Sequence, residues 1–140
     1  MTFDVSDTVK DQSLNYLRDN VDTIVLLDAD PGIGTGQPYT DATTNNGTST
    51  GKRLASQAMV PGDFTVEDGA TDGRKVTAVA KNDVSVVAPG DASHVAWLDS
   101  GASEVLHVTE LTTVRTGLQV SDLVDIPSHF HAYRQPVQAT

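Results

Sequence analysis

Beyond residue 22 the apolar residues come in short runs separated by turn-forming residues, and this spacing constrains the fold more than any other feature of the chain. The run 23–27 is β-branched and apolar on both faces, which predicts a central strand. From residue 53 onward, short strands recur about every ten residues, with Gly, Pro, Asn and Asp between them. We therefore predict a mainly β protein, a single β-sandwich or barrel-like domain of about six to eight short antiparallel strands.

The β-rich body is expected to occupy residues 54–134 of one domain, 1–140, because neither a linker nor an internal repeat divides the chain. Beyond residue 60 the expected strands are 64–66, 74–80, 84–88, 93–98, 104–111, 120–126 and 130–134. The second and third of these are expected to form one hairpin, through residues 81–83, and the fourth and fifth another. The side chains expected to be fully buried include Ile24, Val25, Leu26, Val95 and Val108.

Residues 6–21 are the one stretch with helical periodicity, and they predict a single N-terminal helix. Ser6 or Asp7 can cap its first turn, and Arg18 suits the negative end of the helix dipole. We expect its buried face to hold Val9, Ser13, Tyr16, Leu17 and Val21.

Residues 33–53 consist almost entirely of small and polar residues, so we expect a long polar loop or an extended arm. A loop of this length in a compact domain is usually functional or disordered. It holds one aromatic residue, Tyr39, and the adjacent basic pair Lys52 and Arg53. We interpret all three as candidates for a partner interface, with Tyr39 as the buried anchor and the basic pair facing an acidic surface. The alternative is that Lys52 and Arg53 only lie along the face of the sandwich.

The charge of the chain excludes several classes of partner. The 19 acidic residues outnumber the 9 basic ones, for a net charge of −10. A direct nucleic-acid binder or a membrane-surface protein needs a basic face, so neither is expected. Cysteine is absent, which excludes disulfides and thiol chemistry.

Because Asp greatly exceeds Glu and Lys is scarce, we interpret the acidity as adaptation to high salt, the alternative being an ordinary acidic protein.

No motif predicts catalysis or a cofactor. The glycine-rich segment 32–36 is followed by Pro38 and lacks the Lys-Ser/Thr pair of a phosphate-binding loop. No Gly-x-Ser-x-Gly nucleophile motif occurs, so no enzyme and no catalytic residue is predicted. No metal is predicted either, but His129 and His131 have the spacing of two ligands on one face of a strand. Further ligands in that case would come from His94, His107 and Asp125.

The order of several short motifs resembles a family of small structural proteins of tailed bacterial and archaeal viruses. The motifs are Ser-Leu-Asn-Tyr-Leu-Arg-Asp-Asn-Val-Asp at 13–22, Tyr-Thr-Asp-Ala-Thr at 39–43, Asp-Gly-Arg-Lys-Val-Thr at 72–77, Ala-Ser-His-Val-Ala-Trp-Leu-Asp at 92–99 and Val-Leu-His-Val-Thr-Glu-Leu at 105–111. The resemblance covers most of residues 10–127. Residues 128–136 depart from the family, whose members tend to end in an alternating acidic and apolar strand.

This resemblance implies a non-enzymatic virion structural protein, of the kind that decorates or cements a capsid. The implied partners are the major capsid protein or neighbouring virion proteins, together with copies of the protein itself. The implied location is the virion, assembled in the host cytoplasm, and the acidity adds a halophilic archaeon as host. Two alternatives remain: a head–tail connector or tail component, and a receptor- or carbohydrate-binding module.

Overall fold

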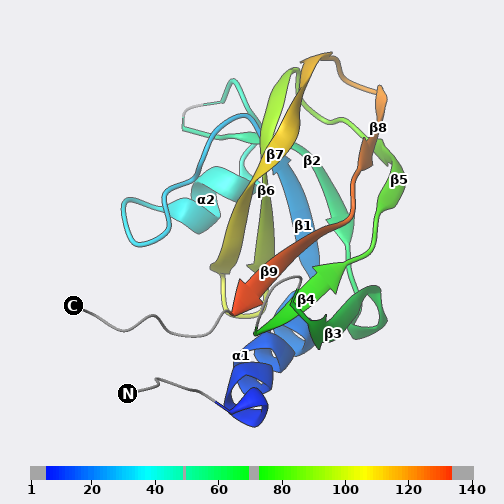
Figure 1. Ribbon diagram of the computed structural model, residues 1–140. Coiled ribbons are helices and arrows are strands. Elements are labelled where there is room, and N and C mark those ends of the chain that lie inside the picture. Colours follow the sequence, from blue (N-terminus) through cyan, green and yellow to red (C-terminus); the bar gives the residue numbers. More distant parts are fainter. Residues whose placement is uncertain (1–5, 49, 70–72, 134–140) are drawn as a thin grey trace, which may run out of the picture.

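The computed structural model describes residues 6–48, 50–69 and 73–133 (Figure 1). It confirms a mainly β fold of antiparallel sheets with one main helix near the N-terminus. The helical elements are α1 (Asp7–Asn20), α2 (Pro38–Thr43) and the short 3₁₀ turn η1 (Pro61–Asp63). The strands are β1 (Thr23–Leu27), β2 (Arg53–Ala58), β3 (Phe64–Asp68), β4 (Arg74–Ala78), β5 (Lys81–Ser85), β6 (Gly90–Asp99), β7 (Glu104–Leu118), β8 (Leu123–Ile126) and β9 (His129–Tyr133).

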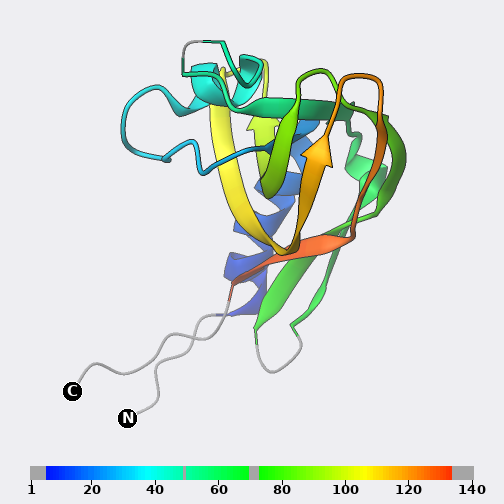
Figure 2. The same cartoon turned by 90° about the horizontal axis from the view of Figure 1, so that it is seen from above.

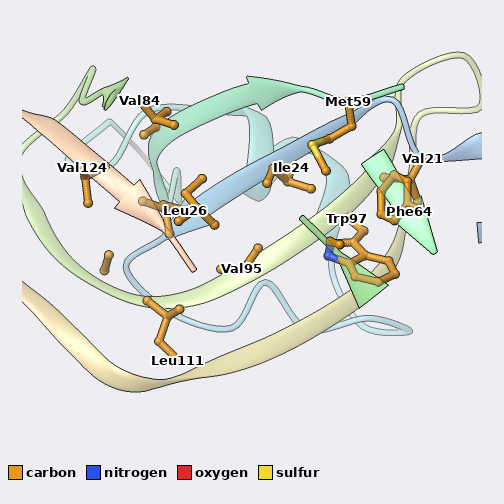
Figure 3. Packing of buried hydrophobic residues seen from close by; sticks show 14 of the residues in the cluster. Val21, Ile24, Leu26, Met59, Phe64, Val84, Val95, Trp97, Leu111 and Val124 are labelled. Carbon is orange, nitrogen blue, oxygen red and sulfur yellow. The ribbon is translucent and has the colours of Figure 1, made fainter. Parts of the chain in front are cut away.

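Three sheets surround one apolar core. The largest has the order β2-β1-β6-β7, and it faces a three-stranded sheet, β3-β4-β9, and a two-stranded one, β5-β8 (Figure 2). Helix α1 packs at the end formed by β3, β4 and β9. Buried side chains from α1 and from all three sheets meet in the core, where Trp97 lies next to Phe64 at one end (Figure 3).

Strand β1 is an inner strand, as its two-faced apolar pattern predicts. It pairs with β2 on one side and with β6 on the other. Ile24 and Leu26 point into the main core, whereas Val25 and Leu27 belong to a second cluster on the other face of the sheet. Val95 is also fully buried, but Val108 is only half-buried, because it lies at the margin of that second cluster.

The helix has the predicted extent, with Ser6 as its N-cap. Of its predicted buried face, Leu17 and Val21 are buried, whereas Val9, Ser13 and Tyr16 are exposed. Val9 and Tyr16 are 56% and 51% exposed, respectively. The side chains that face the core are Lys10, Leu14, Leu17 and Val21. The sequence did not reveal this stripe because it includes a lysine: the Lys10 side chain is 1% exposed, and its ammonium lies 3.2 Å from the exposed Asp7 carboxylate.

The hairpin expected through residues 81–83 does not form. Strand β4 pairs with β3 and β9, and the residues expected to turn belong to β5, which pairs with β8. Asp63 holds the chain where it passes from the sheet of β4 to the sheet of β5. Its carbonyl accepts the Val79 N–H at 2.9 Å, and its carboxylate lies 3.0 Å from the Lys81 ammonium. The hairpin of β6 with β7 is confirmed, with Asp99 opposite Glu104.

Candidate functional site

The segment 33–53 is not the structureless loop expected from its composition, because it contains α2. Pro38 begins this helix, where its fixed φ angle and missing N–H are no disadvantage. Ala42 is completely buried on the outer face of the large sheet, against a cluster that includes Val25 and Leu98. The segment is therefore attached to the sheet by an apolar contact that a polar composition does not reveal.

A groove of about 620 Å³ separates this segment from the turn between β6 and β7. One wall consists of Ile33 and residues 37–40, and the other of residues 103–105. Tyr39 lines the groove and is half-buried against the cluster beneath α2. The one charged side chain in the lining given by the described residues is Glu104, so this groove combines an apolar floor with negative charge.

The backbone beside the groove is fixed by hydrogen bonds. The Gly32 N–H donates to the Asp30 carboxylate at 2.8 Å, and the Thr35 N–H donates to the Gly32 carbonyl at 3.0 Å. Gly32 has a φ of +76°, a conformation that glycine adopts without strain. These bonds shape the turn that carries Ile33.

Lys52 and Arg53, the other two interface candidates, are not among the residues that line the groove. The Lys52 N–H donates to the Asp41 carbonyl at 2.9 Å, which connects β2 to the helix. The Arg53 guanidinium donates twice to the Asn45 side-chain oxygen, at 3.0 and 2.8 Å. Neither side chain forms an ion pair with an acidic residue in the described part of the chain. Of the three interface candidates, Tyr39 alone lines the groove.

The histidine pair His129 and His131 lies on β9 and points towards Trp97 and His107, the latter on β7. The ring centroids of Trp97 and His107 are 4.7 Å apart, as are those of His107 and His131. The Trp97 indole N–H donates to Nε2 of His129 at 2.6 Å, and Nδ1 of His129 lies 2.9 Å from the Pro127 carbonyl oxygen. Both nitrogens of His129 are therefore occupied, and neither is free to coordinate a metal ion.

The other two potential ligands are elsewhere. Nδ1 of His94 lies 2.7 Å from the Ser93 hydroxyl, and the Asp125 carboxylate accepts the Asp83 N–H at 3.0 Å. Within residues 6–48, 50–69 and 73–133, no group of three or more His, Cys, Asp or Glu side chains is arranged to hold a metal ion. The geometry of these residues thus gives no support to a metal site.

Ser93 and His94 also lack the arrangement of a nucleophile and its base. The Ser93 hydroxyl donates its one hydrogen to the Asp28 carbonyl at 2.8 Å. His94 must then donate to the Ser93 oxygen, so the imidazole is not placed to remove the hydroxyl proton.

Sequence reasoning missed the second wall of the groove and the position of Trp97 among the histidines. The first depends on the turn at residues 103–105 lying beside α2, and no local pattern carries that information. A partial signal existed for the second, because residues two apart on a strand share a face, which placed His129 and His131 on the same side. Among the described helices, none combines the length and apolarity that crossing a membrane requires.

No protein-family model, curated protein or solved structure matches this chain.

Proposed function

We propose that this protein is a non-enzymatic structural protein of a virion, and that it decorates or cements the capsid shell of a tailed virus from a high-salt environment. The observation that carries the proposal is the order of the motifs that resemble the viral structural family. Those motifs include parts of α1, α2, β4, β6 and β7. They also include three residues of the groove lining, namely Tyr39, Thr40 and Val105.

The groove at Tyr39 supports a docking role. It is open, has an apolar floor, and is held by α2 and the β6–β7 turn on a rigid sheet. A half-buried aromatic residue in such a place resembles the anchors that dominate the binding energy of many interfaces. On a capsid each contact can be weak, because many neighbouring copies act together.

Tyr39→Ala is expected to weaken attachment to the shell at least about tenfold, since removing an interface anchor typically costs 2 kcal/mol or more. Capsids stripped of the protein would be mixed with purified variant, sedimented, and the bound fraction measured against concentration. Tyr16→Ala is the matched control, because Tyr16 is exposed on α1 away from the groove. A folded Tyr39→Ala variant that binds at wild-type occupancy would exclude the groove as the docking site.

Lys52→Ala tests the alternative contact with an acidic surface. If Lys52 faces a partner carboxylate, its loss should weaken attachment by roughly twofold to fivefold at low salt and less at high salt, because exposed ion pairs are screened. Binding curves at two salt concentrations would measure this, and an unchanged curve at low salt would contradict the contact. Deleting the segment is a poorer test, since it removes buried Ala42 and the Asn45 partner of Arg53.

The copy number per virion separates the decoration role from the connector role. A decoration protein should match the number of capsid subunits, whereas a connector should match one ring at a single vertex. Quantitative mass spectrometry of purified virions would decide between them.

A further inference from the structure

Three of the four histidines lie together around the one tryptophan, although they come from β7 and from the C-terminal strand β9. We propose that His107, His129 and His131 form a pH-sensitive clasp that holds β9 against Trp97 at neutral pH and releases it in acid. This inference is independent of the proposed virion function and concerns the chain alone.

The hydrogen bonds of His129 fix its protonation state. An indole N–H can only donate, so Nε2 of His129 must be the unprotonated acceptor of the 2.6 Å bond from Trp97. A carbonyl can only accept, so Nδ1 must carry the single proton and donate to Pro127 at 2.9 Å. A second proton would place an N–H at Nε2, directly opposite the indole N–H. Protonated His129 is therefore incompatible with this contact between β6 and β9.

Loss of that bond is costly because Trp97 is completely buried. Its ring is enclosed by Phe64 at 5.2 Å, His107 at 4.7 Å and His129 at 5.5 Å between centroids. An indole N–H left there without an acceptor is strongly destabilising. The protein can relieve this by moving His129, and with it β9, away from the indole.

His107 and His131 add to the same effect. Nε2 of His107 is buried and has no hydrogen-bond partner among the described residues, so a charge on this ring would be poorly solvated. Burial, together with the nearby His131 and His129, lowers the pKa of His107 to about 4. Burial also lowers the pKa of His129 and of His131. Each proton gained makes the next one less favourable, because the rings are in contact.

The charged groups around the cluster do not compensate a positive charge. Glu110 and Arg115 of β7 line the same small cavity as His129, one of each sign. In the ladder between β4 and β9, Arg74 lies opposite Tyr133. The Arg74 guanidinium already forms ion pairs with Asp11 of α1 and Asp68 of β3. No carboxylate in the described part of the chain is within ion-pair distance of the three imidazoles.

Strand β9 is the element that protonation should release from β6 and β7, while its ladder with β4, the contact of Lys75 with the Phe130 ring and the packing against α1 act on its other side. It is an edge strand that pairs with β4 alone. The described contacts of β9 to β6 and β7 include the Trp97 hydrogen bond and the His131–His107 ring contact. All three folded pKa values lie below the ordinary value of about 6.5, so the clasp contributes its full stability above that pH. That contribution is lost as the pH falls from about 6.5 through about 4.

The test is hydrogen–deuterium exchange with mass spectrometry at about pH 7 and about pH 5, corrected for the intrinsic pH dependence of exchange. Amides of β9 should exchange at least about tenfold faster at the lower pH, while those of β1 and β6 keep their protection. Fluorescence of Trp97, the one tryptophan, should change over the same range and report the loss of its partner. Simultaneous loss of protection in β9 and β1, or unchanged β9 protection, would overturn the proposal.

His129→Gln is the decisive variant, because glutamine can accept the indole N–H but does not gain a proton. In this variant the increase in β9 exchange should fall below about threefold. His94→Gln is the matched control, since His94 lies outside the cluster and should respond as the wild type does. If His129→Gln does not fold, His131→Gln takes its place, with a reduced acid response expected. A wild-type response in the folded variant would overturn the clasp.

Discussion

Ile24→Ala and Leu26→Ala are each expected to lower the free energy of unfolding by about 2–5 kcal/mol. Both side chains are completely buried on the inner face of β1, which is hydrogen-bonded on both sides. Ile24 lies opposite Trp97 and Leu26 opposite Val95 in the ladder with β6, so each truncation leaves a cavity between strands that cannot move together easily.

Urea unfolding, followed by circular dichroism, would measure these losses as a lower midpoint with an unchanged slope. Val9→Ala is the matched control, because it also shortens an aliphatic side chain but at a site 56% exposed on α1. That variant should stay within about 0.5 kcal/mol of the wild type. Two core variants as stable as the control would contradict the central position of β1.

Elements whose information is local were predictable from the sequence. The apolar run of β1, the cap at Ser6 and the hairpin of β6 with β7 are each specified by neighbouring residues. Elements that depend on distant contacts were not. The pairing of β5 with β8 rather than β4 follows from the contacts of Asp63, which lies on η1 and not in the predicted turn.

The candidate site divides in the same way. Tyr39 was identifiable as the one aromatic residue in a polar segment, but helix α2 around it is only six residues long and gives no periodic signal. The shared face of His129 and His131 followed from strand geometry, whereas the engagement of His129 by Trp97 depends on β6 and β9 meeting across the core. The spacing of His129 and His131 therefore predicted that both side chains share one face of the strand, but it did not predict what they contact.

The melting temperature is expected to fall by about 10 °C when the ionic strength is lowered from molar salt to about 0.05 M, equivalent to about 2–3 kcal/mol for a domain of this size. The net charge is −10, and most of the described carboxylates have no cationic partner within the described residues. At molar salt their repulsion is screened over about 3 Å, and dilution restores it across the surface. Three basic residues, Lys52, Arg53 and Arg115, form no ion pair with the described acids, and their charges are already included in the net value of −10.

Calorimetry over a series of sodium chloride concentrations would measure this dependence at a constant pH near 7, where the histidine clasp is closed. The double variant Asp28→Asn and Glu104→Gln removes two exposed negative charges, so its melting temperature should fall less on dilution. Five basic side chains form ion pairs with carboxylates, such as Arg74 with Asp11 and Asp68, and the double variant leaves these pairs unchanged. The difference in melting temperature between the two proteins therefore reports on the unpaired carboxylates. A melting temperature that is flat or rises on dilution would contradict adaptation to high salt, and the acidity would then be that of an ordinary acidic protein.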